Sequence, residues 1–460
     1  MMDARTRLLL DAPIVPTILR MALPNVAVML VQASIGLIET YFVAKLGLDA
    51  LAGMALVFPV LMLLQMVSAG AMGGGILSAI ARSLGSGQRI KANELVWTAI
   101  VITILLGAIA TVLAVLFAPA LYAAMGGEGG ALAAAALYSG IVFSAAIPLW
   151  LFNSLASIIR GTGNMVFPAA VTIAGAGFLI PVSPMLIFGV GPFPKLGIAG
   201  GAAAIVLYYI VGTFVFAWYI WSGRTALKPS AIPSGLRWSL AREILRVGLA
   251  SSIVSLSTNI SIGVATGLAG LVGPATIAGY GTGVRLEYML VPLIFGLGTP
   301  VAALVGTCVG AGLNNRARRV AWIGAAIGGG LAEAIGLAAA LFPASWLSLF
   351  GQEPEMIAYG TSYLQIVGPV YGFFGAGLSL YFACQGAGKV GGVMGLAIIR
   401  VIVAVGGGWL ALSLHGGSTG LFIALAFSLV IYGIGNIGVV ATGDWFRQAT
   451  PDTTRLQIAE

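Results

Sequence analysis

The sequence predicts an all-α integral membrane protein whose twelve transmembrane helices form two six-helix lobes, and three observations lead to this fold class. Hydrophobic residues make up 59% of the 460 residues and charged residues only 8%, whereas a soluble domain carries about 25% charged residues. Twelve apolar stretches reach the roughly 20 residues that a helix needs to cross a hydrocarbon core about 30 Å thick. The two halves of the chain also repeat one another.

The apolar stretches are joined by short polar connections. Arg5 and Arg7 precede the first stretch, which lacks a small-residue cleavage site and is therefore expected to stay in the membrane rather than to be removed as a signal peptide. Prolines inside the stretches predict kinks, because proline removes a backbone hydrogen bond of the helix; they are Pro24, Pro59, Pro148, Pro292, Pro300 and Pro369. The expected spans are residues 15–44, 50–80, 94–119, 131–160, 167–190, 196–222, 243–272, 276–310, 319–343, 356–386, 390–414 and 419–446.

An internal repeat is found when the sequence is compared with itself. At an offset of 226 residues, Gly47 aligns with Gly273, and after a slip of one residue the matches continue at an offset of 225, so that the two sets together extend over some 120 residues. Matches between glycines occur often by chance in a chain with 66 glycines, so matches between rarer residues are the stronger evidence for a repeat. These matches are Trp97 with Trp322, Glu128 with Glu353 and Tyr138 with Tyr363. Because each unit holds an even number of spans, the halves share one orientation, which predicts a pseudo-twofold axis along the membrane normal.

The repeat divides the chain into an N-lobe, residues 1–222, and a C-lobe, residues 243–446. Residues 223–242 hold two prolines and several basic residues, a composition typical of a linker, and residues 447–460 form a tail. Two six-helix bundles on one linker can rock about a central cleft, the usual geometry of alternating access in secondary transporters.

Basic residues are distributed unevenly between the connections. If the N-terminus is cytoplasmic, 18 of the 22 Lys and Arg residues lie on the cytoplasmic side, including Arg447 and Arg455, and only Lys45 and Lys195 lie outside. This positive-inside pattern places both termini in the cytoplasm. The net charge of +8 therefore reflects topology and does not indicate nucleic-acid binding. A bacterial inner membrane is the expected location.

Residues with catalytic or metal-binding chemistry are few. Cys308 and Cys384 lie in apolar segments with no second cysteine or histidine at ligand spacing, so neither a disulfide nor a metal site is predicted. The single histidine, His415, stands near the end of a span and receives no role. No P-loop motif is present to use nucleotide energy, and no catalytic constellation indicates an enzyme. We expect no cofactor, and an ion gradient as the energy source.

Several motifs together resemble the multidrug and toxic compound extrusion family of cation-coupled efflux antiporters. The first half contains Pro24, GLIETYFVAKLGLDALAG (36–53), Pro59, RSLGSG (82–87) and RGTGN (160–164). The second half contains GLVGPATIAGYGTGVRLE (270–287), VGTCVGAGLNNRARR (305–319), YLQIVGP (363–369) and QGAGK (385–389). The likeness extends over residues 15–446. It implies a central cavity and the export of organic, often cationic, compounds in exchange for protons or sodium.

Glu39 is the first candidate for the coupling acid. An ionisable residue at membrane depth costs about 2.5–3.5 kcal/mol on insertion scales, so it indicates a functional site. Members of the family usually carry Asp here, and the repeat partner of Glu39 is Ala265, so the shared fold does not require an acid. With Asn25 and Gln32 it forms a polar stripe at spacings of seven residues, expected to face the cavity. The alternative is an acid that reaches the headgroups or pairs with Lys45.

The coupling ion is expected to be the proton, with sodium as the alternative. Some family members carry an Asn and an Asp in span five, and the resemblance places Leu179 and Ser183 at those positions. A sodium ion takes five or six oxygen ligands and favours carboxylates, so the missing acid weakens an N-lobe sodium site. A carboxyl at Glu39 can instead alternate between a protonated form and a charged form that binds substrate.

The C-lobe carries the other charged residues within spans. Glu287 is a second candidate for cation coupling, and it cannot pair with Arg285 because residues two apart point to different sides of a helix. Glu333 and Arg400 are candidates for a buried ion pair, and a structural role is as plausible as a transport role. Asn153, Tyr280 and Tyr371 are candidate cavity-lining residues, although isolated polar residues in spans more often join helices.

Other functions compete with drug export. A lipid-linked oligosaccharide flippase of the same superfamily would share the helix layout but usually carries a more cationic cavity. A channel is less compatible with two tandem lobes around a cleft. We therefore expect an antiporter for small organic compounds that works in the lipid bilayer, as a monomer and without nucleic acid.

Overall fold

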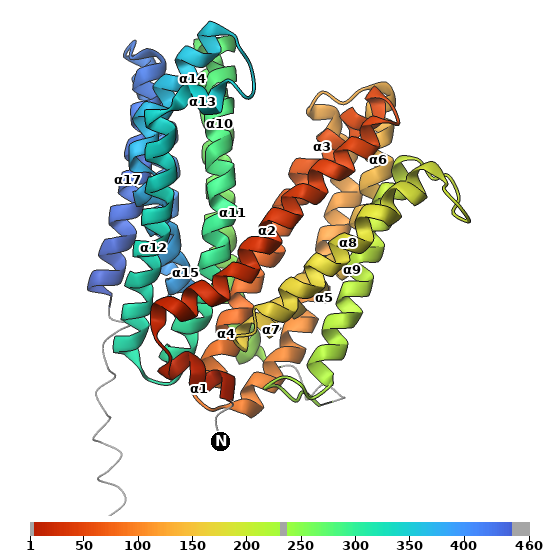
Figure 1. Ribbon diagram of the computed structural model, residues 1–460, viewed down its shortest axis with the longest axis vertical. Coiled ribbons are helices and arrows are strands. Elements are labelled where there is room, and N and C mark those ends of the chain that lie inside the picture. Colours follow the sequence, from red (N-terminus) through yellow and green to blue (C-terminus); the bar gives the residue numbers. More distant parts are fainter. Residues whose placement is uncertain (1–3, 231–236, 444–460) are drawn as a thin grey trace, which may run out of the picture.

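Every secondary-structure element described in the computed structural model is a helix, and the described residues are 4–230 and 237–443 (Figure 1). The expected tail, residues 447–460 with Arg447 and Arg455, lies outside the described residues. Within the expected linker, residues 231–236 also lie outside them.

Twelve membrane spans are confirmed. Eleven helical segments of the described chain are long and apolar enough to cross a membrane, and a twelfth is obtained when two shorter helices that meet at a 50° bend are taken as one span. The elements in chain order are α1 (Ala4–Asp11), α2 (Ile14–Ala44), α3 (Leu48–Gln65), the π-helix η1 (Met66–Met72), α4 (Gly73–Gly85), α5 (Arg89–Ala124), α6 (Gly129–Ser144), α7 (Ala146–Gly161), α8 (Val166–Phe188), α9 (Ile198–Trp221), α10 (Trp238–Val272), α11 (Pro274–Gly310), α12 (Asn314–Leu341), α13 (Pro343–Leu347), α14 (Pro354–Val367), the 3₁₀-helix η2 (Gly368–Val370), α15 (Tyr371–Ala387), α16 (Gly391–Ser413) and α17 (Gly417–Thr442).

Two of the six predicted proline kinks are breaks, and both interrupt the fourth span of a lobe. The bend between α6 and α7 stands three residues before Pro148, which has no N–H to bond the carbonyl of Ser144. The turn of 3₁₀-helix around Pro369 separates α14 from α15 in the same way. The remaining prolines lie inside continuous helices, and the second span is interrupted instead by η1.

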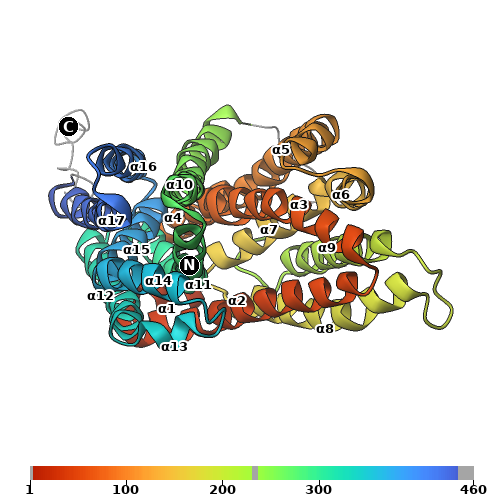
Figure 2. The same cartoon turned by 90° about the horizontal axis from the view of Figure 1, so that it is seen from above.

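Helices α2–α9 form the N-lobe and α10–α17 form the C-lobe. The two groups of helices meet at the end of the molecule that carries α1 and diverge towards the opposite end (Figures 1 and 2). We call the meeting end the α1 end. The hydrophobic core is divided accordingly into two clusters, one per lobe, and they exchange residues at the α1 end, where Leu77 of α4 joins the C-lobe cluster and Ile244 of α10 joins the N-lobe cluster.

Glycine contacts between α4 and α11 display the pseudo-twofold relation. A Cβ atom on Gly85 would stand 2.1 Å from the carbonyl oxygen of Thr307, and a Cβ atom on Gly310 would stand 2.1 Å from the carbonyl oxygen of Arg82. Gly85 and Gly310 are 225 residues apart, and so are Arg82 and Thr307. The same contact is therefore made twice, once from each lobe. Only glycine permits this approach of two helix backbones, so the repeated glycines fix where the lobes touch.

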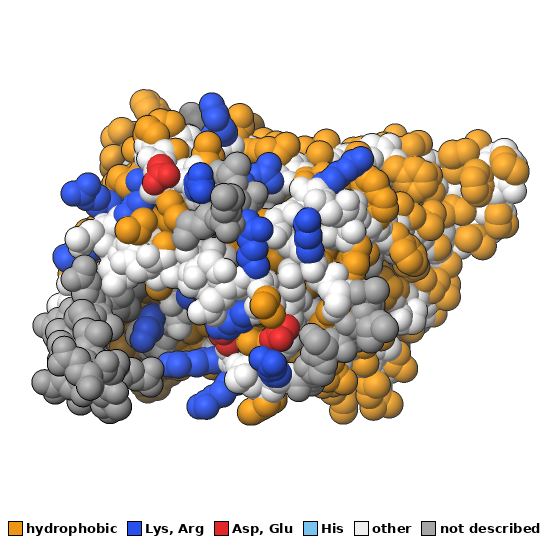
Figure 3. Space-filling model, turned by 90° about the horizontal axis from the view of Figure 1, so that it is seen from below, with side chains coloured by type: hydrophobic (Ala, Val, Ile, Leu, Met, Phe, Trp, Pro, Cys, Tyr) orange, Lys and Arg blue, Asp and Glu red, His pale blue; other side chains and the backbone are white. Residues whose placement is uncertain are grey.

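The surface also agrees with a membrane protein. Large apolar side chains such as Phe214 and Trp409 are more than half exposed on the sides of the lobes. Lys and Arg side chains gather on the face at the α1 end (Figure 3). An apolar flank with a basic rim is the expected surface of a protein embedded in lipid.

Candidate functional site

The N-lobe holds Glu39 in a buried position between helices. Its side chain is only 3% exposed, and its Oε1 atom accepts a hydrogen bond of 3.0 Å from the Ser183 hydroxyl of α8. Among the described residues Glu39 forms no salt bridge. The Lys45 ammonium lies over the Tyr41 ring instead, so the alternative that pairs Glu39 with Lys45 is not what the structure shows.

The predicted polar stripe on α2 is divided among different environments. Asn25 is buried near the crossing with α11, where Val26 contacts Gly296, while Gln32 is exposed and Glu39 is buried again.

The π-helix η1 is joined to other helices by polar side chains. Asn153 of α7 donates a hydrogen bond of 2.8 Å to the Ser68 hydroxyl in η1, so it joins two helices. Gln65, the last residue of α3 before η1, donates a hydrogen bond of 2.6 Å to the Tyr209 hydroxyl. These contacts anchor the π-helix within the N-lobe.

The C-lobe holds its acid in a different way. Glu287 of α11 and Arg400 of α16 form an ion pair of 3.1 Å between Oε1 and Nη2, and each side chain is only 6% exposed. The Arg400 guanidinium also lies 4.8 Å from the centre of the Phe374 ring. Glu287, Arg400 and Tyr280 line a small pocket together with Tyr363, Ser261 and several apolar side chains. The acid is thus neutralised within its own lobe.

Glu333 is not the partner of Arg400, which corrects the expected pair. Its Oε2 atom accepts a hydrogen bond of 2.7 Å from the backbone N–H of Gly372. Gly372 is the second residue of α15, and the first N–H groups of a helix have no partner within it. The break at Pro369 creates this helix start, so Glu333 binds the start of α15 and not Arg400.

Two other predicted residues are also placed by the structure. Arg285 lies over the Phe350 ring, and Tyr371 is fully buried with its hydroxyl 3.4 Å from that of Tyr363.

Ion pairs between the lobes occur at the α1 end, and the sequence analysis missed them. Glu243 of α10 accepts from Arg82 of α4 over 2.9 Å and from Lys91 of α5 over 2.8 Å. Arg82 also donates to the carbonyl of Gly386. We call Glu243, Arg82 and Lys91 the inter-lobe latch. Glu243 is an acid among basic residues near the start of its helix, and this difference in charge could have indicated an ion-pair partner for the basic residues.

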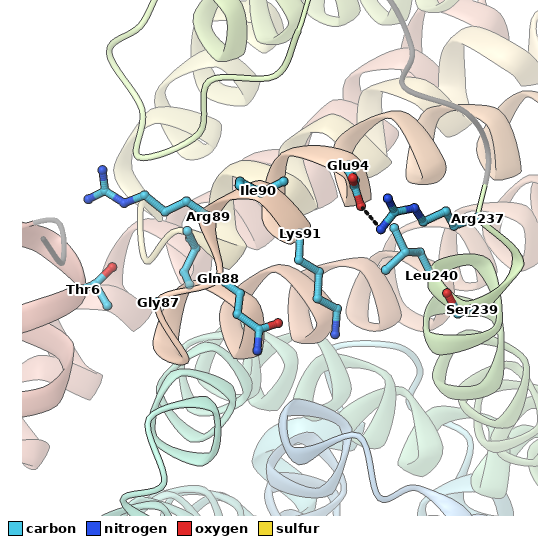
Figure 4. A pocket seen from close by; sticks show the side chains of 11 residues that line it. Thr6, Gly87, Gln88, Arg89, Ile90, Lys91, Glu94, Arg237, Ser239 and Leu240 are labelled. Atoms are coloured by element: carbon cyan, nitrogen blue, oxygen red, sulfur yellow. Dashed lines mark ion pairs between the residues drawn. The ribbon is translucent and has the colours of Figure 1, made fainter. Parts of the chain in front are cut away.

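A hollow of about 820 Å³ lies beside the latch. It is bounded by α1, by the start of α5 and by the start of α10, and Figure 4 shows Lys91, Glu94 and Arg237 on its wall. Arg237 and Glu94 form a further ion pair of 3.4 Å across the two lobes. The hollow therefore opens at the seam between the lobes. In the part of the chain that is described, no group of three His, Cys, Asp or Glu side chains could hold a metal ion.

Comparison with known proteins finds relatives along nearly the whole chain. The model of the MatE family matches residues 24–185 and 247–410. A Deinococcus radiodurans protein named "Probable multidrug resistance protein NorM" is 26% identical over 459 residues, which cover 93% of this chain and 97% of the relative. A Shewanella oneidensis protein named "FAD transporter" is 24% identical over 80% of this chain and 81% of the relative.

Solved structures share the fold. A crystal structure of MATE in the bent conformation matches with a TM-score of 0.88 at 23% identity and covers 96% of this chain and 98% of that chain. The outward-facing conformation of a multidrug resistance MATE family transporter matches with a TM-score of 0.84 at 22% identity, over 96% and 99% of the two chains. The arrangement of twelve helices in two lobes is therefore common to all three chains.

Proposed function

This chain belongs to the MatE family of membrane transporters, and from that premise we propose that it is a secondary active antiporter. It exports organic, mainly cationic compounds in exchange for protons, working as a monomer in a bacterial inner membrane. This assignment is supported by two relatives that are named "Probable multidrug resistance protein NorM". Glu39 carries the coupling.

The observation that supports this role is the isolation of Glu39. It is buried, a hydroxyl is its hydrogen-bond partner, and the ion pairs of the described residues do not include it. A buried carboxylate without a neighbouring cation is costly at membrane depth. The site therefore favours either a proton on the carboxyl or a bound cation beside the carboxylate. An organic cation and a proton exclude one another there, which is the requirement for exchange.

The surroundings of Glu39 favour protons over sodium. Hard cations require several oxygen ligands. Ser183 offers one hydroxyl to Glu39, and Leu179, one turn earlier on α8, is a buried side chain without an oxygen. A proton needs no further ligand, so the same site serves for proton exchange.

Alternating access follows from the two lobes. The α1 end is the cytoplasmic end, where the basic residues gather and where the positive-inside rule places them (Figure 3). Both termini are assigned to that side. The latch joins the lobes there, which supports the assignment of this arrangement to a state closed to the cytoplasm. Substrate uptake from the cytoplasm requires the latch to open.

A flippase for lipid-linked oligosaccharides is the second candidate. Its substrate carries phosphate groups, which cationic side chains in the cavity would recognise. The fully buried charged residues of the described chain are Glu39, which has no salt bridge, in the N-lobe and the neutral pair of Glu287 and Arg400 in the C-lobe. This distribution favours cationic over anionic substrates.

The experiment is transport by the purified protein in liposomes with an imposed proton or sodium gradient. We expect a cationic dye to move in the direction opposite to the proton flux. Glu39→Gln should abolish this dye movement while expression is retained. Glu353→Gln, which alters an exposed loop acid, is the matched control and should transport normally.

Three outcomes would contradict the proposal. Retained coupling in Glu39→Gln would remove Glu39 from the mechanism. Dye movement driven by sodium alone would overturn the proton assignment. Movement of a lipid-linked sugar without dye transport would select the flippase. FAD, which the name of one relative suggests, serves as the anionic comparison substrate.

A further inference from the structure

The residue opposite the Glu39 carboxylate is a glycine from a third helix. Gly201 lies in the first turns of α9, and a Cβ atom built on it would stand 2.5 Å from Glu39 Oε1. This is the same oxygen atom that accepts the Ser183 hydrogen bond. Oε1 therefore occupies the space that a side chain at position 201 would fill, with Ser183 of α8 as its hydrogen-bond donor.

The neighbouring Gly200 has a different role, which makes the two glycines separable. A Cβ atom on Gly200 would stand 2.5 Å from both the carbonyl carbon and the carbonyl oxygen of Leu186. That contact is with the backbone of α8, which cannot move aside easily, so Gly200 serves the packing of α8 against α9. The contact of Gly201 is with the end of a flexible side chain, so a substitution there acts on the carboxylate first.

We propose that Gly201 is a positioning residue for Glu39: its missing side chain leaves the space that holds a glutamate carboxylate against Ser183. This inference rests on the proposed function, because it explains how the coupling acid is held. It adds a specificity rule, namely that the size of residue 201 decides which acid can work at position 39. A glutamate fits beside glycine, and the shorter aspartate fits beside alanine.

The sign of the expected effect follows from the hydrogen bond. A methyl group at position 201 forces Oε1 to turn away, and the carboxylate then loses the Ser183 donor. That donor stabilises the charged form, so its loss favours protonation. The substitution leaves unchanged the phenol of Tyr138 in α6, the titratable side chain that interacts with Glu39. The midpoint of the pH profile of transport should move upward by about one to two pH units, the size expected for a hydrogen bond to a charged group.

The length of the acid provides the compensating change. Glu39→Asp shortens the side chain by one methylene group, so the carboxylate withdraws from both Ser183 and Gly201. Gly201→Ala adds one methyl group in the space that was vacated. The two substitutions should therefore be much less harmful together than their separate effects predict, which a double-mutant cycle measures.

The experiment compares Gly201→Ala, Glu39→Asp and the double variant in liposomes over a range of pH, with Gly177→Ala as control. A Cβ atom on Gly177 meets no atom within 4 Å, so this control should match the native protein. We expect each single variant to lose most of its coupled transport and the double variant to recover at least half of it. Infrared difference spectra should show the carboxyl band of Glu39, identified by its absence in Glu39→Gln, displaced in Gly201→Ala.

Two results would overturn the inference: a native pH profile and an unmoved carboxyl band in Gly201→Ala, or a double variant no better than Glu39→Asp. A failure of the proposed function is distinguishable from these. In that case Glu39→Gln itself keeps proton-coupled transport, while the infrared band still reports whether Gly201 positions the carboxyl group.

Discussion

The two lobes each bury an acid within the membrane, but they stabilise it in opposite ways. Glu39 in the N-lobe has a hydroxyl partner, whereas Glu287 in the C-lobe has the guanidinium of Arg400 at 3.1 Å. The chain repeats itself over these lobes, and yet the acids do not stand at equivalent positions, because Ala265 is the repeat partner of Glu39. The architecture is symmetric and the charge distribution is not.

Under the proposed function, this difference separates an exchangeable charge from a paired one. A carboxylate with a resident cation stays charged and needs no proton. A buried carboxyl without one changes its charge whenever a cation enters or leaves. The N-lobe acid is therefore suited to coupling, and the C-lobe acid to holding α11 and α16 together.

The largest expected effect is on stability, when Arg400→Met leaves Glu287 as an unpaired buried acid. Removing one partner of a buried ion pair typically costs about 3–5 kcal/mol, so the free energy of unfolding in lipid discs should fall by that amount. The pH profile of transport should keep its midpoint. Replacing both partners, with Glu287→Gln and Arg400→Met, should restore most of the stability. An altered pH midpoint in Arg400→Met would break the comparison between the lobes.

An intermediate effect is expected at the latch, because its ion pairs join the two lobes and would have to separate in the proposed alternating-access cycle. Glu243→Gln should favour separation at the α1 end by about 1–2 kcal/mol, or roughly tenfold in the ratio of the two states. Spin labels at the exposed Leu48 and Leu349 would report the distance between the far ends of the lobes. Glu355→Gln, at an exposed acid, is the control. An unchanged distance distribution would show that the latch does not hold the closed state.

The smallest effect is expected at Glu333, the acid at the start of α15. Glu333→Gln keeps an oxygen for the Gly372 N–H and loses only the charge at a helix N-terminus, which contributes about 0.3–1 kcal/mol. Thermal unfolding should detect a shift of that size, with transport unchanged. A loss of proton coupling in this variant would place a second exchangeable acid in the C-lobe.

Hydropathy and the repeat predicted the spans, their number and the two lobes, because each depends on residues close together in the chain or on a constant offset. The resemblance aligned Ser183 with a family position that carries an acid, and the structure brings its hydroxyl to Glu39. The partners of the other charged residues were not predictable in this way. Arg400 is 113 residues from Glu287, and Arg82 is 161 residues from Glu243.

Hydropathy therefore predicted that Glu39, Glu287 and Glu333 lie within spans, since a long apolar stretch indicates a membrane-crossing helix whatever its neighbours are. The environments of these three acids depend on which helices are neighbours and how far each is rotated, and that is set by packing between distant segments. Packing gives Glu287 a cation, Glu333 a helix N-terminus, and Glu39 a hydroxyl together with the space that Gly201 leaves for its carboxylate. The amino-acid pattern thus defined the membrane fold, and the contacts between helices distinguished three acids that look alike in the sequence.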